Sequence, residues 1–278
     1  MFARWNSFIA AYPDWLLRIG EAADFMRAKS TGRYGILLGL QSSTHFRNPD
    51  DVDTFYGLGQ RSGQLTYNYR SLAGNGAFGR RDDGVSEFGV RLIERMNRAG
   101  MAVDCGHAAD RTILDACQLS KKPVIISHAN CRALLPSSPR CVTDEAIQGI
   151  AGTGGAMGIN FISMMAKAHE PTTVDDVIEH IDHVAKLAGI EHVGIGSDMG
   201  IESNDFMPPD QLARMIAGMD PKYGAKHRRE AVEHLDHPKR IYDLTDGLIK
   251  RKYSDEHIRL ILGENWRRTL STIWTPVA

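Results

Sequence analysis

Two short stretches, MAVDCGH at residues 101–107 and PVIISHAN at residues 123–130, indicate how this chain folds. Each is an aliphatic run that ends in polar residues and a histidine. Similar aliphatic runs recur along the chain, and longer amphipathic stretches separate them, which is the pattern of parallel strands joined by crossover helices. We therefore predict six strands, at Gly35 to Leu40, Gly63 to Tyr67, Met101 to Cys105, Pro123 to Ser127, Ala156 to Phe161 and His192 to Gly196.

The 278 residues fit one α/β domain, and we predict a TIM-type (β/α) barrel over residues 1–278. Such barrels commonly run to about 250 residues as a single unit and have eight strands. With six strands in the pattern, the first strands are missing. Residues 204–246 are rich in proline and charge, and they predict an insertion or long loop with one short helix around residues 211–219. An apolar stripe predicts a helical tail over residues 254–274.

The predicted gap in the barrel has a consequence, because open parallel edges with apolar faces invite pairing. The edges at Gly35 to Leu40 and His192 to Gly196 would face each other across it. We expect that the natural reading frame starts upstream of Met1, or that the gap is covered by a partner chain, as in a homo-oligomer, or by residues 204–246.

Composition and charge exclude several classes of protein. There are 33 basic and 34 acidic residues, so no net field would attract nucleic acid. No apolar run approaches the roughly 20 residues of a membrane span, and Met1 to Tyr12 lack the features of a secretory signal. Four scattered cysteines make no disulfide framework. We expect a cytoplasmic protein that acts on a small molecule, with neither a nucleic-acid nor a membrane partner.

Polar residues follow the predicted strands at the ends where β/α barrels collect their functional groups. These residues are Gln41, Tyr67, Asn68, Asp104, His107, Ser127, His128, Asn160, Ser197 and Asp198. His107 and His128 close consecutive strands, and neutral imidazole is the commonest zinc ligand in hydrolytic sites. Adjacent strands lie about 4.8 Å apart, so both histidines can reach one ion. Asp198 could bind metal, act as a general base or cap a helix.

Other histidines fit structural roles better. His180 and His183 share one face of a predicted helix, and we expect that face to be solvated. His234 and His237 lie in the charged insertion and are expected at the surface.

Residues 97–107, NRAGMAVDCGH, and residues 122–130, KPVIISHAN, place two histidines 21 residues apart. These segments, together with residues 139–144, 194–200 and 261–268, resemble in order and spacing the motifs of the renal (membrane) dipeptidase family of zinc hydrolases. The resemblance implies a binuclear zinc site that activates water for attack on a dipeptide. By position it implies zinc binding by His107, His128 and Asp198, proton transfer by Asp198, and substrate binding by Arg140, Tyr67, Asn68 and Gln41.

The chain also departs from the family pattern. No strand with the family's His-x-Asp precedes Gly35, Gln41 stands where the family has a bridging carboxylate, and Tyr67 stands where it has a histidine; a bacterial subgroup shares the last two changes. A neutral amide brings no charge to offset two dications, so we expect one zinc rather than two, or none. Three hypotheses remain. The first is a metal-dependent hydrolase of dipeptides or related small amides, and the second is a catalytically impaired homologue that binds a small molecule or acts in a complex. The third is hydrolysis of a nonpeptide amide or lactone, which shares the chemistry of the first and differs in pocket shape.

Overall fold

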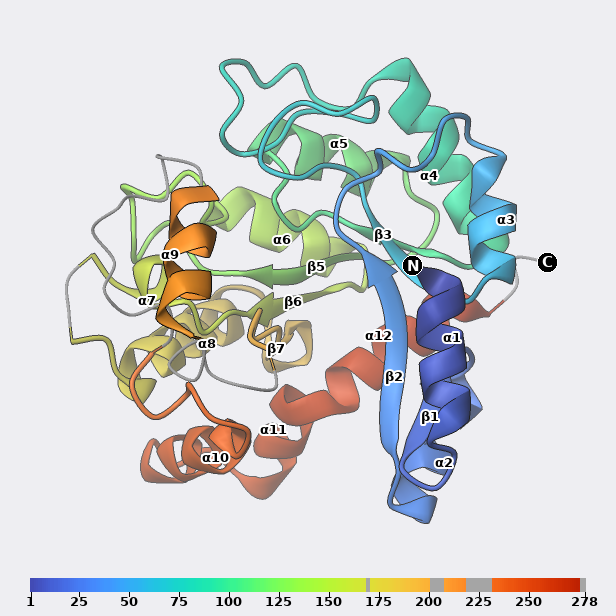
Figure 1. Ribbon diagram of the computed structural model, residues 1–278. Helices are drawn as coiled ribbons and strands as arrows, with labels where there is room; N and C mark the ends of the chain where they lie inside the picture. The colour runs from blue at the N-terminus through green and yellow to red at the C-terminus, as the bar shows by residue number, and fades with distance from the viewer. Residues whose placement is uncertain (169–170, 201–207, 219–231, 276–278) are drawn as a thin grey trace.

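The computed structural model describes residues 1–168, 171–200, 208–218 and 232–275. Within them, seven parallel strands form one sheet in chain order from β1 to β7. The strands are β1 Leu16–Ile19, β2 Tyr34–Leu40, β3 Gln60–Gln64, β4 Ala102–Asp104, β5 Val124–Ala129, β6 Ala156–Ile159 and β7 Val193–Ile195. The sheet is a curled half-barrel of the TIM-type (β/α) fold (Figure 1).

Helices connect successive strands, as parallel pairing requires. They are α1 Phe2–Ala11, α2 Ala22–Thr31, α3 Asp51–Gly57, α4 Glu87–Ala99, α5 Asp110–Leu119, α6 Asp144–Gly152, α7 Ser163–Ala166, α8 Val174–Ala188, η1 Ile190–His192, α9 Pro209–Gly218, α10 Arg240–Lys250, α11 Asp255–Arg259, the π-helix η4 Leu260–Glu264 and α12 Asn265–Trp274. None of the described helices has the length and apolar character needed to cross a bilayer.

Five of the six predicted strands are confirmed as β2 and β4 to β7, whereas β3 begins three residues before the predicted Gly63 to Tyr67. The expectation that the first strands are missing is wrong in one respect, because a strand, β1, precedes Gly35. β1 pairs in parallel with β2, from Leu16 beside Tyr34 to Ile19 beside Leu37. It is four residues long and includes Arg18, so its sequence gives too little alternation to detect. Beyond it comes Gly20, and no His-x-Asp motif accompanies the strand.

Local capping explains where the helices that lead to the site begin and end. The Ser86 hydroxyl accepts a hydrogen bond from the Gly89 N–H at the start of α4, and Gly100 ends that helix in a left-handed conformation with φ of 78°. Thr143 caps α6 in the same way by accepting from the Ala146 N–H. Ser86 and Gly100 thus bound α4 just before β4, and Thr143 begins α6, the helix that precedes β6.

The predicted long loop over residues 204–246 is shorter than expected. Helix α10 already begins at Arg240, and α9 confirms the short helix near residue 211. Residues 201–207 and 219–231 of this segment lie outside the described residues.

Apolar side chains pack on both faces of the sheet. Helices α4, α5, α6 and α8 cover its outer face, and α12 lies along the other face against β4, β6 and β7 (Figure 1). The inner cluster joins Ala102 of β4 and Ile125 of β5 to Leu270 and Ile273 of α12. The helical tail predicted for residues 254–274 is therefore confirmed, and it fills the concave side of the open sheet.

The free edge of β7 is covered by the same tail. The Asn265 side-chain amide donates to the main-chain oxygen of Val193 at 2.7 Å, and the Trp266 indole N–H donates to that of Ile195 at 2.9 Å. These bonds satisfy an edge that would otherwise invite pairing with another chain. The sequence analysis did not predict that the β7 edge would be covered in this way. The cover comes from the residues where η4 joins α12.

Candidate metal centre

Two histidines from neighbouring strands meet at the carboxyl end of the sheet. His107 follows β4 and His128 belongs to β5, and both side chains are buried. Their Nε2 atoms lie 2.9 Å apart. Asp198, which follows β7, places Oδ2 3.9 Å from His128 Nε2. His107 and His128 therefore meet at neighbouring strand ends, and Asp198 approaches His128 from a third strand end.

The far nitrogen of each imidazole also has a partner. His107 Nδ1 lies 2.7 Å from Asn68 Oδ1, and His128 Nδ1 lies 2.8 Å from the Ser127 hydroxyl. An amide oxygen only accepts, so His107 carries its proton on Nδ1 and turns a lone pair on Nε2 toward His128. Metal-binding histidines are typically oriented in this way through their second nitrogen.

Burial keeps both imidazoles neutral. It lowers the pKa of His128 to about 3, and the nearby Arg140 guanidinium lowers it further. The pKa of His107 is lowered even more by burial, then by Arg140 and His128. Neutral imidazole is the form that binds a metal cation, so the pair is ready for one without losing protons.

Arg140 and Asp198 set the charge of the site. The Arg140 guanidinium is buried, and one of its nitrogens donates to the main-chain oxygen of His128 at 2.8 Å. Burial raises the pKa of Asp198, and Arg140 partly offsets that rise. Arg140 therefore brings positive charge beside the imidazole pair, and Asp198 brings negative charge.

The substrate-binding residues expected from the sequence occupy different depths. Tyr67 stacks on His107 with ring centroids 4.2 Å apart and remains half-exposed. Burial raises the pKa of its hydroxyl, as does the Asp198 carboxylate. Asn68 is buried behind His107 and holds that imidazole. Gln41 follows β2 with an exposed side chain.

Three of the five non-glycine residues with left-handed backbone in the described part of the chain lie at the same end of the sheet; the other two are His234 and Lys252. His107 has φ of 65°, Asp198 has φ of 57°, and Ser42, next to Gln41, has φ of 77°. Left-handed backbone costs an ordinary L-residue roughly 1–2 kcal/mol. Strain of this kind clusters at functional sites, where the surrounding structure fixes a side chain's direction. It points to the carboxyl ends of β2, β4 and β7 independently of the side chains there.

Two glycines let the strands approach closely behind His128. A Cβ on Gly196 would lie 1.8 Å from the main-chain oxygen of Ser127, and one on Gly158 would lie 2.2 Å from it. Real Cβ atoms do not approach so closely, so any side chain at either position would push β5 away. The position of His128 therefore depends on both glycines.

One histidine prediction is wrong. His180, expected on a solvated face, is fully buried on α8. Its Nδ1 accepts the Cys131 N–H at 3.0 Å, and its Nε2 donates to the Ala166 oxygen at 3.0 Å. Both nitrogens are satisfied by the main chain, so His180 is a structural histidine. His183 is only partly exposed, and its Nε2 lies 2.7 Å from the Asp144 carboxylate.

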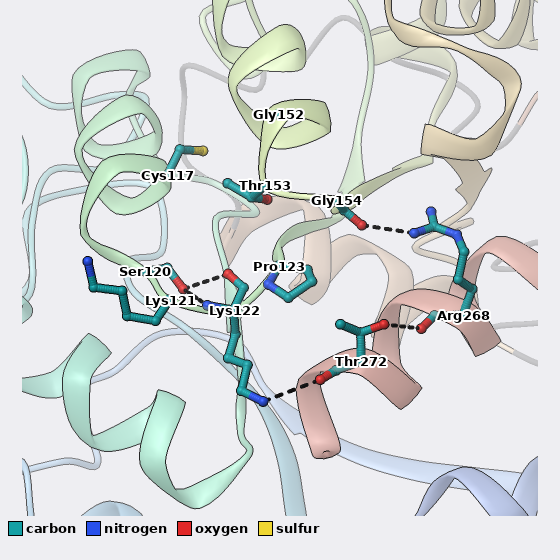
Figure 2. Close-up of a pocket in the computed structure, with 10 residues that line it drawn as sticks. All are labelled: Cys117, Ser120, Lys121, Lys122, Pro123, Gly152, Thr153, Gly154, Arg268 and Thr272. Carbon is teal, nitrogen blue, oxygen red and sulfur yellow. Dashed lines mark hydrogen bonds between the residues drawn. The ribbon is translucent and has the colours of Figure 1, made fainter. Parts of the chain in front are cut away.

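A cavity of about 430 Å³ lies at the opposite end of the sheet (Figure 2). Its walls include Pro123 before β5, Gly154 before β6, and Lys122 and Arg268. Lys122 Nζ donates to the main-chain oxygens of Thr272 and Thr275, and Arg268 donates to those of Gly154 and Glu191. These cations therefore hold helix and loop ends together, and the cavity is not the chemical centre.

The imidazole pair fits part of the ligand shell of a metal ion. In the described part of the chain, no group of three or more His, Cys, Asp or Glu side chains could hold a metal by itself. Neutral nitrogens from His107 and His128 suit zinc, and Asp198 would be the carboxylate that joins them.

Sequence reasoning missed Gln64, the last residue of β3. Its side-chain amide donates to the Ser127 hydroxyl at 3.3 Å, directly behind His128. Gln64 and Thr66 are both buried, and they are polar residues two positions apart at the end of a strand. That spacing places both on one face of the sheet, and this was the available signal.

The half-barrel carries its paired histidines at the carboxyl ends of its strands, where (β/α) barrels collect their functional groups. The family model of membrane dipeptidase (peptidase family M19) matches residues 3–228, and the chain belongs to this family.

Similar proteins agree with that assignment. The chain is 34% identical over 204 residues to the uncharacterized dipeptidase C965.12 of Schizosaccharomyces pombe, with 68% of this chain and 47% of the relative covered. It is 28% identical to dipeptidase verJ of Clonostachys rogersoniana, with 96% and 63% covered. The chain thus spans about half to two thirds of these relatives. A crystal structure of an amidohydrolase from Pseudomonas aeruginosa superposes with a TM-score of 0.88 at 29% identity, covering 98% of this chain and 83% of that one.

Proposed function

We propose that this chain hydrolyses dipeptides or related small amides with one zinc ion held by His107 and His128. The observation that carries the proposal is the buried pair of neutral imidazoles whose Nε2 atoms lie 2.9 Å apart at adjacent strand ends. Zinc bound there would supply a Lewis acid for the peptide carbonyl and an activated water at neutral pH. Membership in a dipeptidase family supports this substrate class.

The chain's own residues would divide the remaining work. Asp198 accepts a proton from the attacking water, because its carboxylate lies beside the imidazole pair and burial raises its pKa toward the range of a general base. Arg140 binds the carboxylate of the substrate, since its planar fork matches a carboxylate in two hydrogen bonds. Tyr67 stacks on the His107 ring and Asn68 holds its Nδ1, while Gln41 follows the carboxyl end of β2.

One ion rather than two follows from the charge near the site. Gln41 is neutral, so a second dication beside the first would lack compensating charge. Replacing Gln41 by Glu should raise zinc occupancy, because it returns a negative charge and a second donor oxygen. An unchanged zinc content in Gln41→Glu would show that the neutral side chain of Gln41 does not limit zinc binding.

A second function has one observation in its favour. The described residues contain no complete metal cage, and Gln41 replaces a charged ligand. A homologue that lost turnover and binds a small molecule, alone or in a complex, would fit the same features. Such a protein would bind dipeptides at the same site without cleaving them.

Hydrolysis of matched substrates separates the two functions. Zinc-loaded protein is incubated with an alanyl dipeptide and with the corresponding dipeptide amide, which lacks the free carboxylate. We expect cleavage of the dipeptide and slower cleavage of the amide, because Arg140 recognises a carboxylate. Binding of the dipeptide without any cleavage would favour the second function, and cleavage of both at equal rates would remove Arg140 from substrate recognition.

A further inference from the structure

A second arginine holds the loop that carries Arg140. Arg132 follows β5 and is partly buried, whereas residues 133–139, between the two arginines, are mostly exposed, with only Leu135 buried. So exposed a stretch makes few apolar contacts that could fix its shape. The position of the Arg140 side chain therefore depends on hydrogen bonds between this loop and the rest of the protein.

The Arg132 guanidinium supplies such bonds on both sides of Arg140. Its Nη2 donates to the main-chain oxygen of Pro139 at 3.0 Å. Its Nε and Nη2 donate to the main-chain oxygen of Cys141 at 2.9 and 2.6 Å. Pro139 and Cys141 are the immediate neighbours of Arg140 in the chain. One planar group thus ties down the main chain just before and just after Arg140.

The same guanidinium is anchored to the start of α5. Nη1 and Nη2 of Arg132 pair with the two carboxylate oxygens of Asp110, the first residue of that helix. The Thr143 hydroxyl, at the start of α6, donates to the same carboxylate at 3.3 Å. A bidentate pair fixes direction as well as distance, because both groups are planar. Arg132 therefore cannot turn without breaking its bonds to Asp110 and to the loop together.

The main chain of Arg132 closes the base of the loop separately. Its N–H donates to the Val142 oxygen, and the Val142 N–H donates to the Asn130 oxygen, each at 2.8 Å. These bonds form a short parallel bridge between Cys131 and Val142. A change of the Arg132 side chain leaves this bridge in place, so it removes only the bonds that reach the two neighbours of Arg140.

We propose that Arg132 is a positioning residue that holds Arg140 in place and thereby sets the preference of the site for a substrate with a free carboxylate. The proposal rests on the proposed role of Arg140 in binding that carboxylate. Arg140 is buried beside His128, with one nitrogen 2.8 Å from the main-chain oxygen of that histidine. A bidentate pair needs both planar groups aligned, so a small shift of the loop weakens it.

The variant Arg132→Met tests this role, because it keeps the length of the side chain and removes every donor. Binding is measured by calorimetry with two ligands that cannot be cleaved. One is an alanyl-alanine analogue in which a methylene group replaces the peptide N–H, and the other is the same compound with its carboxylate converted to an amide. The wild type should bind the carboxylate about ten-fold more tightly than the amide. In Arg132→Met this preference should fall to within about two-fold, with the affinity for the amide almost unchanged.

A matched control is an arginine that donates to main-chain oxygens away from the site. Arg268 donates to those of Gly154 and Glu191 at 3.1 and 2.6 Å. Arg268→Met should keep the preference of about ten-fold, since it positions no group at the site. A loss of preference in both variants, or equal losses of affinity for both ligands in Arg132→Met, would indicate general destabilisation and overturn the proposal. An unchanged preference in Arg132→Met would overturn it as well.

A double variant tests the route through Arg140. Arg140→Met alone should abolish the preference for the carboxylate. Adding Arg132→Met should then lower the affinity for the carboxylate ligand by at most about two-fold, because the group that it positions is gone. An undiminished loss on adding Arg132→Met would show that Arg132 acts on the carboxylate without Arg140, which contradicts a positioning role.

If Arg132→Met fails to fold, Arg132→Lys takes its place. Lysine keeps the charge but lacks the fork that spans Asp110 and the loop, so the preference should fall about three-fold, and an unchanged preference would overturn the proposal. The ligands are not cleaved, so the preference can follow the prediction in a chain that hydrolyses no dipeptide. Failure of the positioning role is therefore distinguishable from failure of the proposed hydrolase function.

Discussion

The two ends of the sheet use polar side chains in different ways. At the carboxyl end, His107 and His128 turn their Nε2 atoms toward each other at 2.9 Å, on a strained backbone. At the amino end, Lys122 and Arg268 donate to the main-chain oxygens of neighbouring segments. The side chains at the carboxyl end contact one another, whereas the cations at the amino end hold helix and loop ends together. Chemistry is expected at the first end and stability at the second, as in other β/α barrels.

The largest expected effect is the difference between removing a histidine of the proposed metal site and removing a histidine outside it. His128→Ala removes half of the imidazole pair, so several kcal/mol of transition-state stabilisation should be lost and kcat/KM for an alanyl dipeptide should fall about 1,000-fold. The control His183→Ala removes a partly exposed histidine that contacts Asp144. It should keep kcat/KM within about two-fold. Comparable losses in both variants would erase the distinction between the two kinds of histidine.

Replacing a glycine by alanine should have opposite effects on the free energy of unfolding at the two ends of the sheet. Gly196→Ala brings its Cβ against the Ser127 oxygen, so the free energy of unfolding should fall by about 1–3 kcal/mol and zinc binding should weaken. Gly152→Ala, in α6 beside the amino-end cavity, meets nothing within 4 Å. It should raise the free energy of unfolding by about 0.5–1 kcal/mol. Urea denaturation measures both, and a neutral Gly196→Ala would show that β5 and β7 can separate freely.

Arginine-to-lysine changes sharpen the comparison further. Arg140→Lys keeps the charge but loses the planar fork, so the KM for a free dipeptide should rise about ten-fold, the equivalent of 1.4 kcal/mol. Arg268→Lys breaks one of two bonds to main-chain oxygens at the other end. It should lower the melting temperature and leave KM unchanged. If KM changed in Arg268→Lys and not in Arg140→Lys, substrate recognition would lie at the amino end of the sheet, which contradicts this prediction.

The smallest expected effect concerns acid stability. Burial lowers the pKa of His180, so the folded protein keeps this imidazole neutral while the unfolded chain takes up a proton below about pH 6.5. Its contribution to stability is complete above that pH and is lost as the pH falls. The free energy of unfolding of the zinc-free protein, measured between pH 7.5 and 5, should therefore decline less steeply in His180→Gln than in the wild type. Identical slopes would mean that His180 does not titrate on unfolding.

The sequence predicted the fold and most of the strand-end residues because parallel strands bring their carboxyl ends to one edge. His107, His128 and Asp198 could be placed together on that argument alone. β1 escaped detection because four residues that include Arg18 carry too little periodicity. Its place in the sheet is set by pairing with β2, which is tertiary information.

Roles that depend on hydrogen-bond partners could not be predicted from the sequence. His180 lies on an amphipathic helix and resembles a surface residue until its two main-chain partners are known. Gln64 and Asp104 are polar residues at strand ends like several others. Only their hydrogen bonds to Ser127 separate them from residues that merely pack.

The central claim is that the carboxyl end binds one zinc ion through His107 and His128. Elemental analysis of the purified protein after zinc loading and removal of excess metal tests it most directly. We predict one zinc per chain in the wild type and none retained in His128→Ala, with His183→Ala like the wild type. No zinc in the wild type, two tightly bound ions, or one ion retained in His128→Ala would contradict the claim.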